Sequence, residues 1–247
     1  MDFLGFVIIC VKVLVVFSAT MLTVLMMVYA ERRVSAFMQG RLGPNRVGPQ
    51  GLLQPIADGI KFLMKEDIIP AEVNKPIYLL APAMLLIPAL MTFAVIPFGS
   101  TITLFGREVP LQVADLNVGI LYILALTSIG VYGLVLAGWA SNCKYSLIGG
   151  LRSSAQLISY ELAMGLSVVS VILLAGSLKL NVIVEDQQGY LLSWNVFKQP
   201  VAFLIFLVAV FAETNRLPFD LTEAEQELVG GYHTEYSSMK FAMFFMA

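Results

Sequence analysis

The sequence predicts an all-α membrane protein, a polytopic bundle with five full transmembrane spans, the start of a sixth, and one interfacial amphipathic helix. Two observations on composition predict it. The 247 residues are 58% hydrophobic and 13% charged, whereas a soluble domain carries about a quarter charged residues. Mean hydropathy is +0.83. Apolar runs close to the roughly 20 residues that a spanning helix needs also recur along the chain. We therefore expect a single membrane domain over residues 1–247.

The apolar runs place the spans in order. We expect them at about residues 3–30, 77–97, 118–140, 153–174 and 197–216. The first lacks a cleavage pattern, so it is expected to be a retained span rather than a signal peptide. The fifth has an apolar stretch of only 201–212 and must draw on polar residues at an end. A sixth segment, 239–247, gives only about 13 Å of helix, so we expect a fragment, a truncated product or one piece of a split subunit.

An amphipathic helix is expected at about residues 52–65. Its apolar residues recur at helical spacing, and its polar residues fall on the opposite face. Pro55 is compatible with the first turn of a helix. The pattern favours a helix lying in the membrane interface, with packing against a soluble partner as the alternative. The apolar face holds Leu53, Ile56, Ile60 and Leu63, and the polar face holds Gln54, Asp58, Lys61 and Lys65.

Lysine and arginine counts predict the orientation, because cytoplasmic loops carry an excess of both. Loops 31–76, 141–156 and 213–238 hold ten, and loops 98–117 and 175–200 hold three. The N-terminus is therefore expected outside, with the odd-numbered loops cytoplasmic. The net charge is −2. The sequence has no basic stretch with interleaved aromatic residues, so it gives no indication of nucleic-acid binding.

The inner loop 213–238 is acidic. Residues 213–235 contain six carboxylates and one arginine. Glu223 and Glu227 would repel at i, i+4 spacing on a helix, and closely coupled carboxylates titrate as a group. A solvated face is one interpretation. Interleaved apolar side chains and a Gly-Gly turn favour the other, a loop folded back into protein.

Glu161 is the sharpest single candidate because it lies inside an apolar span, where an ionisable group is a functional-site hypothesis. A structural carboxylate bonded to Ser159, Tyr160 or a neighbouring helix is the alternative. Glu31 ends the first apolar run beside Arg32, and an interfacial anchor is an equally good interpretation there. Lys12 is expected to snorkel or to pair with a partner, with a charge on an ion pathway as the alternative.

Other motifs narrow the chemistry. Residues 41–51 hold three glycines, two prolines and two arginines, which excludes a helix or a strand and predicts a shaped loop. That loop lacks the phosphate-binding pattern GxxxxGK[ST]. Cys10 and Cys143 have no CxxC spacing and are expected to be packing residues, and a lone His233 makes no metal site. No iron–sulfur or zinc ligand set is expected.

Several segments of the chain resemble the family of the membrane H subunit of bacterial NADH-quinone oxidoreductase, respiratory complex I, which includes mitochondrial NADH dehydrogenase subunit 1. The resemblance covers essentially the whole chain. Its motifs are Glu31-Arg-Arg33, Gly43-Pro-Asn-Arg-Val-Gly-Pro49, residues 51–61, Trp139-Ala-Ser141, Tyr145-Ser-Leu147, residues 151–156, Ile158-Ser-Tyr-Glu161 and residues 213–236.

The resemblance implies a membrane-arm subunit that forms part of a quinone chamber and couples quinone reduction to proton translocation. Quinone is then the substrate, flavin and iron–sulfur clusters belong to other subunits, and no residue here is catalytic. Partners would be the hydrophilic quinone-module subunits, neighbouring membrane-arm subunits and the bilayer of a bacterial-type inner membrane. The implied chamber residues are Arg32, Arg41, Arg46, Phe219, Asp220, Glu223 and Glu225, and the implied proton path is Glu31, Glu161, Glu213 and Glu227.

Two departures from the family pattern bear on this. Members run to roughly 320–350 residues with eight spans, and some carry an acid in the third span where this chain has Ser128-Ile129-Gly130. Alternatives are the homologous subunit of a membrane-bound hydrogenase or of an enzyme with another electron donor, and, in another class, a free-standing proton or solute transporter. The absence of internal repeats disfavours the transporter.

Overall fold

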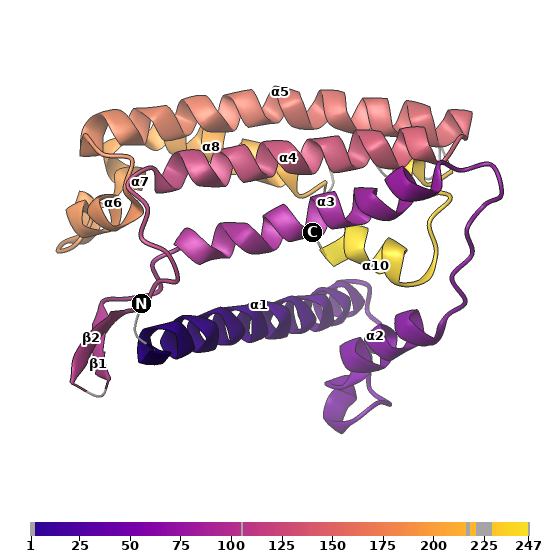
Figure 1. Cartoon of the computed structure of the whole chain (residues 1–247), viewed down its shortest axis with the longest axis horizontal. Helices are drawn as coiled ribbons and strands as arrows, with labels where there is room; N and C mark the ends of the chain where they lie inside the picture. The colour runs from indigo at the N-terminus through magenta and orange to yellow at the C-terminus, as the bar shows by residue number, and fades with distance from the viewer. Residues whose placement is uncertain (1–2, 105, 216–217, 221–228, 247) are drawn as a thin grey trace. The chain divides into compact units, whose positions relative to one another are not determined.

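Helices make up most of the regular structure (Figure 1). The computed structural model describes residues 3–104, 106–215, 218–220 and 229–246. Its elements are α1 (Phe3–Met38), η1 (Pro49–Gly51), α2 (Gln54–Met64), α3 (Lys75–Thr92), η2 (Phe93–Val95), β1 (Thr101–Leu104), β2 (Arg107–Pro110), α4 (Gly119–Ala140), α5 (Lys144–Ala175), α6 (Leu180–Asp186), η3 (Leu191–Ser193), α7 (Asn195–Lys198), α8 (Pro200–Glu213), η4 (Gly231–His233) and α10 (Ser238–Met246). The prediction of a helical protein is confirmed. The chain divides into two compact units, Met1–Ile68 with Ser237–Met246, and Ile69–Tyr236.

In the first unit, α1 continues past the expected end of the first span. The apolar run stops near residue 30, yet the helix goes on through Glu31, Arg32 and Arg33 to Met38. Alanine, glutamate and arginine are good helix formers, so the loss of hydropathy does not end the helix. Large apolar side chains lie exposed along it, including Leu14 and Met27. Such exposure in a helix this apolar is what a lipid-facing or partner-covered helix requires.

The expected amphipathic helix is present as α2, and Ile60 and Leu63 of its apolar face are exposed. Its end is tied to the start of α10. The Ser238 hydroxyl lies 2.9 Å from the carbonyl oxygens of Phe62 and Lys65, groups that a helix C-terminus otherwise leaves unpaired. Lys240 pairs with Asp67 at 2.8 Å.

The second unit is a row of packed helices. Helix α3 packs on α4, α4 on α5, and α5 on α8, an arrangement visible in Figure 1. Its buried side chains include Tyr78 of α3, Leu134 and Ala137 of α4, and Ala209 and Ala212 of α8. Small residues predominate at these buried positions, and small residues let apolar helices approach closely where no hydrophobic effect drives them together.

Four described helices, α1, α3, α4 and α5, are long and apolar enough to cross a membrane. The fifth expected span, 197–216, differs. Gln199, with φ −139, separates the short α7 from α8, and α8 has 14 residues. At 1.5 Å per residue that is about 21 Å, less than the ~30 Å of a bilayer's hydrocarbon core. A fifth crossing therefore stays a prediction.

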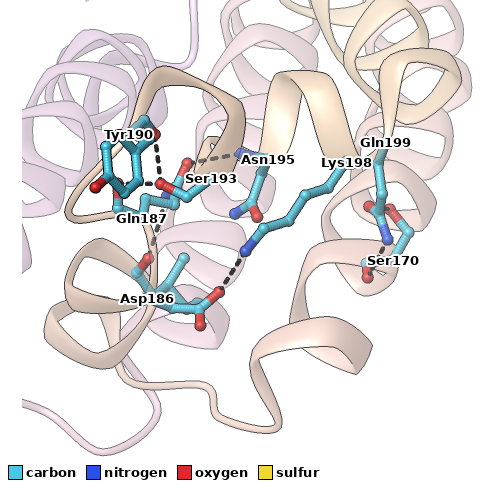
Figure 2. A network of polar contacts seen from close by, with 9 residues as sticks. Ser170, Asp186, Gln187, Tyr190, Ser193, Asn195, Lys198 and Gln199 are labelled. Atoms are coloured by element: carbon cyan, nitrogen blue, oxygen red, sulfur yellow. Dashed lines mark hydrogen bonds and ion pairs between the residues drawn. The ribbon is translucent and has the colours of Figure 1, made fainter.

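Two expected outer loops contain structure that was not predicted. Loop 98–117 carries an antiparallel hairpin of β1 and β2, with Thr101 opposite Pro110. Loop 175–200 carries α6, η3 and α7, joined by polar contacts (Figure 2). There the Lys198 ammonium pairs with Asp186 at 3.0 Å, and the backbone N–H of Asn195 donates to the Gln187 side-chain oxygen at 3.1 Å.

Candidate functional site

Glu161 lies inside α5, a helix of 32 residues, and is half-buried. Its Oε1 accepts a short hydrogen bond from the Ser128 hydroxyl of α4. The Thr127 hydroxyl lies 3.5 Å from the same oxygen. Of the bonding partners considered from the sequence, the neighbouring helix is the one observed, because the Ser159 hydroxyl donates instead to the Ala155 carbonyl. The carboxylate is therefore held at the α4–α5 contact.

Glu213 ends α8 and interacts electrostatically with Glu161. Its Oε2 is buried and has no hydrogen-bond partner among the described residues. Two residues on, Asn215 adopts a left-handed backbone conformation with φ 51. Its side-chain oxygen is also buried and has no hydrogen-bond partner among the described residues. Buried acceptors that lack a donor are costly and uncommon, so this end of α8 is a polar site in apolar surroundings.

The described start of the acidic loop lies against α5. Gln156 donates from its side-chain nitrogen to the Phe219 carbonyl at 2.8 Å. The Phe219 ring meets the Tyr160 ring edge-on at 5.2 Å. Gln156 and Tyr160 are four residues apart, so they share one helix face. Asp220 follows with a buried oxygen, Oδ1, that has no hydrogen-bond partner in the described chain.

The far end of the loop is anchored at two places. Gly231 lies so close to α5 that a Cβ on Gly149 would come within 2.7 Å of its backbone, and the Ser146 hydroxyl donates to the Tyr232 carbonyl at 2.9 Å. These contacts fix η4 on the first turns of α5. The backbones can approach this closely because neither Gly149 nor Gly231 carries a side chain.

The second anchor is a pair of stacked tyrosines. The rings of Tyr78 and Tyr236 lie 4.1 Å apart and nearly parallel, at 5°. The Tyr78 hydroxyl donates to the Glu235 carbonyl at 2.6 Å, and the Tyr236 hydroxyl donates to the Tyr78 carbonyl at 3.3 Å. Burial, and after it the neighbouring Tyr78, raises the pKa of Tyr236 above the ordinary tyrosine value, while a hydrogen bond with Ser141 lowers it. Neither tyrosine was singled out from the sequence.

The predicted arginines belong to the first unit. Arg32 of α1 pairs with Asp58 of α2, Arg41 donates to the Gln39 side-chain oxygen at 2.7 Å, and Arg46 is exposed. Glu31 lies exposed on α1.

Arg33, the last residue of the Glu31-Arg-Arg33 motif, holds the shaped loop to α1. Its guanidinium lies 3.3 Å from the Gln50 carbonyl oxygen, and the Tyr29 hydroxyl donates to the same carbonyl at 2.9 Å. The adjoining turn requires Gly51, whose φ is +77 and whose added Cβ would lie 2.2 Å from the Pro44 oxygen.

Four predicted residues lie in the second unit: Glu213 interacts electrostatically with Glu161, and Phe219, followed by Asp220, contacts Tyr160 beside Glu161 in sequence. Glu31 and the arginines lie in the other unit, and Glu223, Glu225 and Glu227 lie outside the described residues. Within the described chain, no three His, Cys, Asp or Glu residues are grouped as metal ligands. Two apolar cavities of about 590 and 200 Å³ flank α5 and α8 near Ser167 and Gln199, and neither is lined by a predicted site residue.

A sequence model of the family described as NADH dehydrogenase matches residues 11–247. One NADH-quinone oxidoreductase H subunit of Geobacter metallireducens is 59% identical over 235 residues, which are 95% of this chain and 70% of that protein. NADH-quinone oxidoreductase subunit 8 of Rhodothermus marinus is 61% identical over 94% of this chain and 66% of its own length. The NADH-quinone oxidoreductase H subunit of Salinibacter ruber is 58% identical over 94% of this chain and 65% of its own length.

Proposed function

The chain belongs to the NADH dehydrogenase family, that of the membrane H subunit of NADH-quinone oxidoreductase, and we propose that it couples quinone reduction to proton translocation through buried acidic residues. It would contribute by forming part of the quinone chamber, with no catalytic residue of its own. Quinone is the proposed substrate. Flavin and iron–sulfur clusters are assigned to partner subunits.

The observation that carries this proposal is the position of Glu161. It lies within a helix long and apolar enough to cross a membrane, and an ionisable group at such depth is rare unless it serves an ion or proton pathway. Among the residues that the structure describes, it accepts a hydrogen bond from the Ser128 hydroxyl of the neighbouring helix.

Glu213 supplies the second member of the path. Its unpartnered buried oxygen and its electrostatic interaction with Glu161 mean that a change of charge on one carboxyl changes the energy of charge on the other. The proposed path continues to Glu227 on the loop and to Glu31 on α1. A proton gained or lost at Glu161 or Glu213 would then change the electrostatic energy of Glu227 and Glu31, the two ends of the proposed path.

The proposed chamber lies where the acidic loop meets α5. Phe219 and Tyr160 offer aromatic surface there, and Asp220 has an oxygen buried without a partner among the described residues. Glu223 and Glu225 complete the proposed wall from the same loop. Arg32, Arg41 and Arg46 are proposed to shape the chamber and the contact with partner subunits. Reduction of the quinone would change charge beside these acids, and the change would be passed on to Glu213 and Glu161.

The setting proposed is a bacterial-type inner membrane. The chain would act as one membrane domain with five full spans and the start of a sixth, its N-terminus outside and its acidic loop on the inner face. The exposed apolar face of α2, with Ile56, Ile60 and Leu63 at its surface, supports a helix lying in the membrane interface. The exposed apolar side chains of α1 support cover by lipid or by other subunits of the oxidoreductase.

Replacement of Glu161 tests the proposal. In the assembled oxidoreductase, E161Q keeps the size and the hydrogen-bond acceptor of the side chain but cannot ionise. We expect assembly at parental levels, with coupled NADH-quinone turnover and proton pumping reduced at least about a hundredfold, the lower end of the loss expected for a proton-transfer group. E185Q in α6 is the matched control, since Glu185 is an exposed acid, and it should match the parent. Unaltered turnover and pumping in E161Q would exclude the proposed role.

A further inference from the structure

The Ser128 hydroxyl has two acceptors within reach. It makes a short hydrogen bond to Glu161 Oε1 and lies 2.9 Å from the Leu124 carbonyl oxygen, one turn earlier in α4. A serine hydroxyl carries a single hydrogen and two acceptor lone pairs. It can donate to only one of these two oxygens at a time. The lone pairs of its own oxygen stay available to accept a hydrogen bond.

These two acceptors fit the two protonation states of Glu161. When the carboxyl is ionised, the Ser128 hydrogen points to Oε1 and stabilises the charge. When the carboxyl is protonated, its O–H donates to the Ser128 oxygen, and the Ser128 hydrogen turns to the Leu124 carbonyl. A hydrogen bond joins Ser128 to Glu161 in both states, and no heavy atom has to move.

Thr127 is placed differently. Its hydroxyl lies 2.9 Å from the same Leu124 carbonyl but 3.5 Å from Glu161 Oε1, longer than the usual O–H···O range. Its hydrogen therefore belongs to the helix backbone. Ser159, two residues before Glu161, donates to the Ala155 carbonyl. Of the hydroxyls described near Glu161, Ser128 is the one within ordinary hydrogen-bond reach of its carboxylate.

We propose that Ser128 is a positioning residue for the proton that passes through Glu161, acting as donor to the carboxylate and as acceptor from the carboxylic acid. The inference rests on the proposed function and deepens it. The proton that Glu161 gains leaves a neighbouring acid, for which the proposed path names Glu213, and it returns to an acid of the path in the next step. Ser128 neither gains nor loses a proton over the cycle.

The test uses the assembled oxidoreductase and redox-induced infrared difference spectra. E161Q identifies the carboxyl C=O band of Glu161 by its loss. In S128A we expect that band at higher frequency, because the carboxyl has lost its partner, and coupled turnover lowered about tenfold, the cost of one hydrogen bond to a charged group. S128T restores a hydroxyl at the same position and should return both the band and the turnover toward the parent.

S159A is the matched control, since it removes a hydroxyl beside Glu161 that does not contact it, and it should leave the band in place. A Glu161 band that is unshifted in S128A overturns the proposal, while loss of turnover in E161Q leaves the proposed function standing. If E161Q retains full coupled turnover, the proposed function fails instead, and the infrared band of the parent no longer reports a proton on the path.

Discussion

At the residue scale, the stacked tyrosines are the contact with the clearest energetic consequence. Tyr78 and Tyr236 are separated by 158 residues, yet both are buried and each hydroxyl donates to a carbonyl beside the other ring. Aromatic rings stacked in this way contribute beyond the area that they bury. The pair thus fastens the end of the acidic segment to the first turns of α3.

Shortening Tyr236 should therefore destabilise the second unit. We expect Y236A to lower the free energy of unfolding by about 3–5 kcal/mol, the usual cost of deleting a buried aromatic ring. Y236F keeps the stacked ring and loses one hydroxyl contact, so about 1 kcal/mol is expected. Denaturant titration in detergent micelles measures both. Y132A, at a tyrosine of α4 that is 64% exposed, should stay within about 0.5 kcal/mol of the parent, and equal losses at both positions would contradict the role of the stack.

At the element scale, the position of η4 depends on a glycine in α5. A Cβ at position 149 would lie 2.7 Å from the backbone of Gly231, whereas a Cβ at Gly165 of the same helix would meet nothing within 4 Å. The two positions therefore separate the effect of close packing from the effect of helix propensity.

We expect G149A to lower the free energy of unfolding by about 1–3 kcal/mol, because backbone rather than a flexible side chain has to move. It should also expose the segment around η4 to limited proteolysis. G165A should leave proteolysis unchanged and stabilise the helix by up to about 1 kcal/mol. A G149A protein as stable as G165A would show that η4 is not fixed by this contact.

In the second unit, hydropathy predicts the bounds of a helix well where the apolar segment and the helix have the same length. The expected 118–140 agrees closely with α4, because this segment is apolar throughout and ends at a small polar loop. For α5, the expected 153–174 recovers only the apolar part, and the helix begins at Lys144. Residues 144–152 are helical because they pack on η4, which hydropathy does not report.

The hairpin between the second and third long apolar helices also has a signal in the sequence. The alternating Thr101, Ile102 and Thr103, followed by Gly106, are typical of a hairpin, and β1 and β2 form there. The residues of the candidate site also differ in how visible they are in the sequence. Glu161 stands out in sequence because it is a charge among apolar residues, while its partner Ser128 does not, since hydroxyls are common in membrane helices. The Tyr78–Tyr236 contact is set by tertiary packing and has no local signal.

At the scale of the whole molecule, the orientation in the membrane can be tested directly. In a background with Cys10 and Cys143 replaced by alanine, E72C reports on the loop before α3 and E108C on the β hairpin. Both positions are exposed. The excess of lysine and arginine in loop 31–76 predicts that it is cytoplasmic. A membrane-impermeant maleimide applied to intact cells should label E108C and leave E72C unlabelled until the cells are opened. The reverse pattern would invert the proposed topology.

Helix α5 has a further mechanical consequence. Its 32 residues extend about 48 Å, longer than the ~30 Å hydrocarbon core of a bilayer. Near one end it carries the acidic segment through Gln156 and Ser146, and toward the other Ser170 donates to the Gln199 side chain at 2.7 Å (Figure 2). A continuous helix resists bending, so it can act as a lever. A tilt imposed at the end that carries Ser146 would be felt at Gln199, by leverage alone and without any movement of charge.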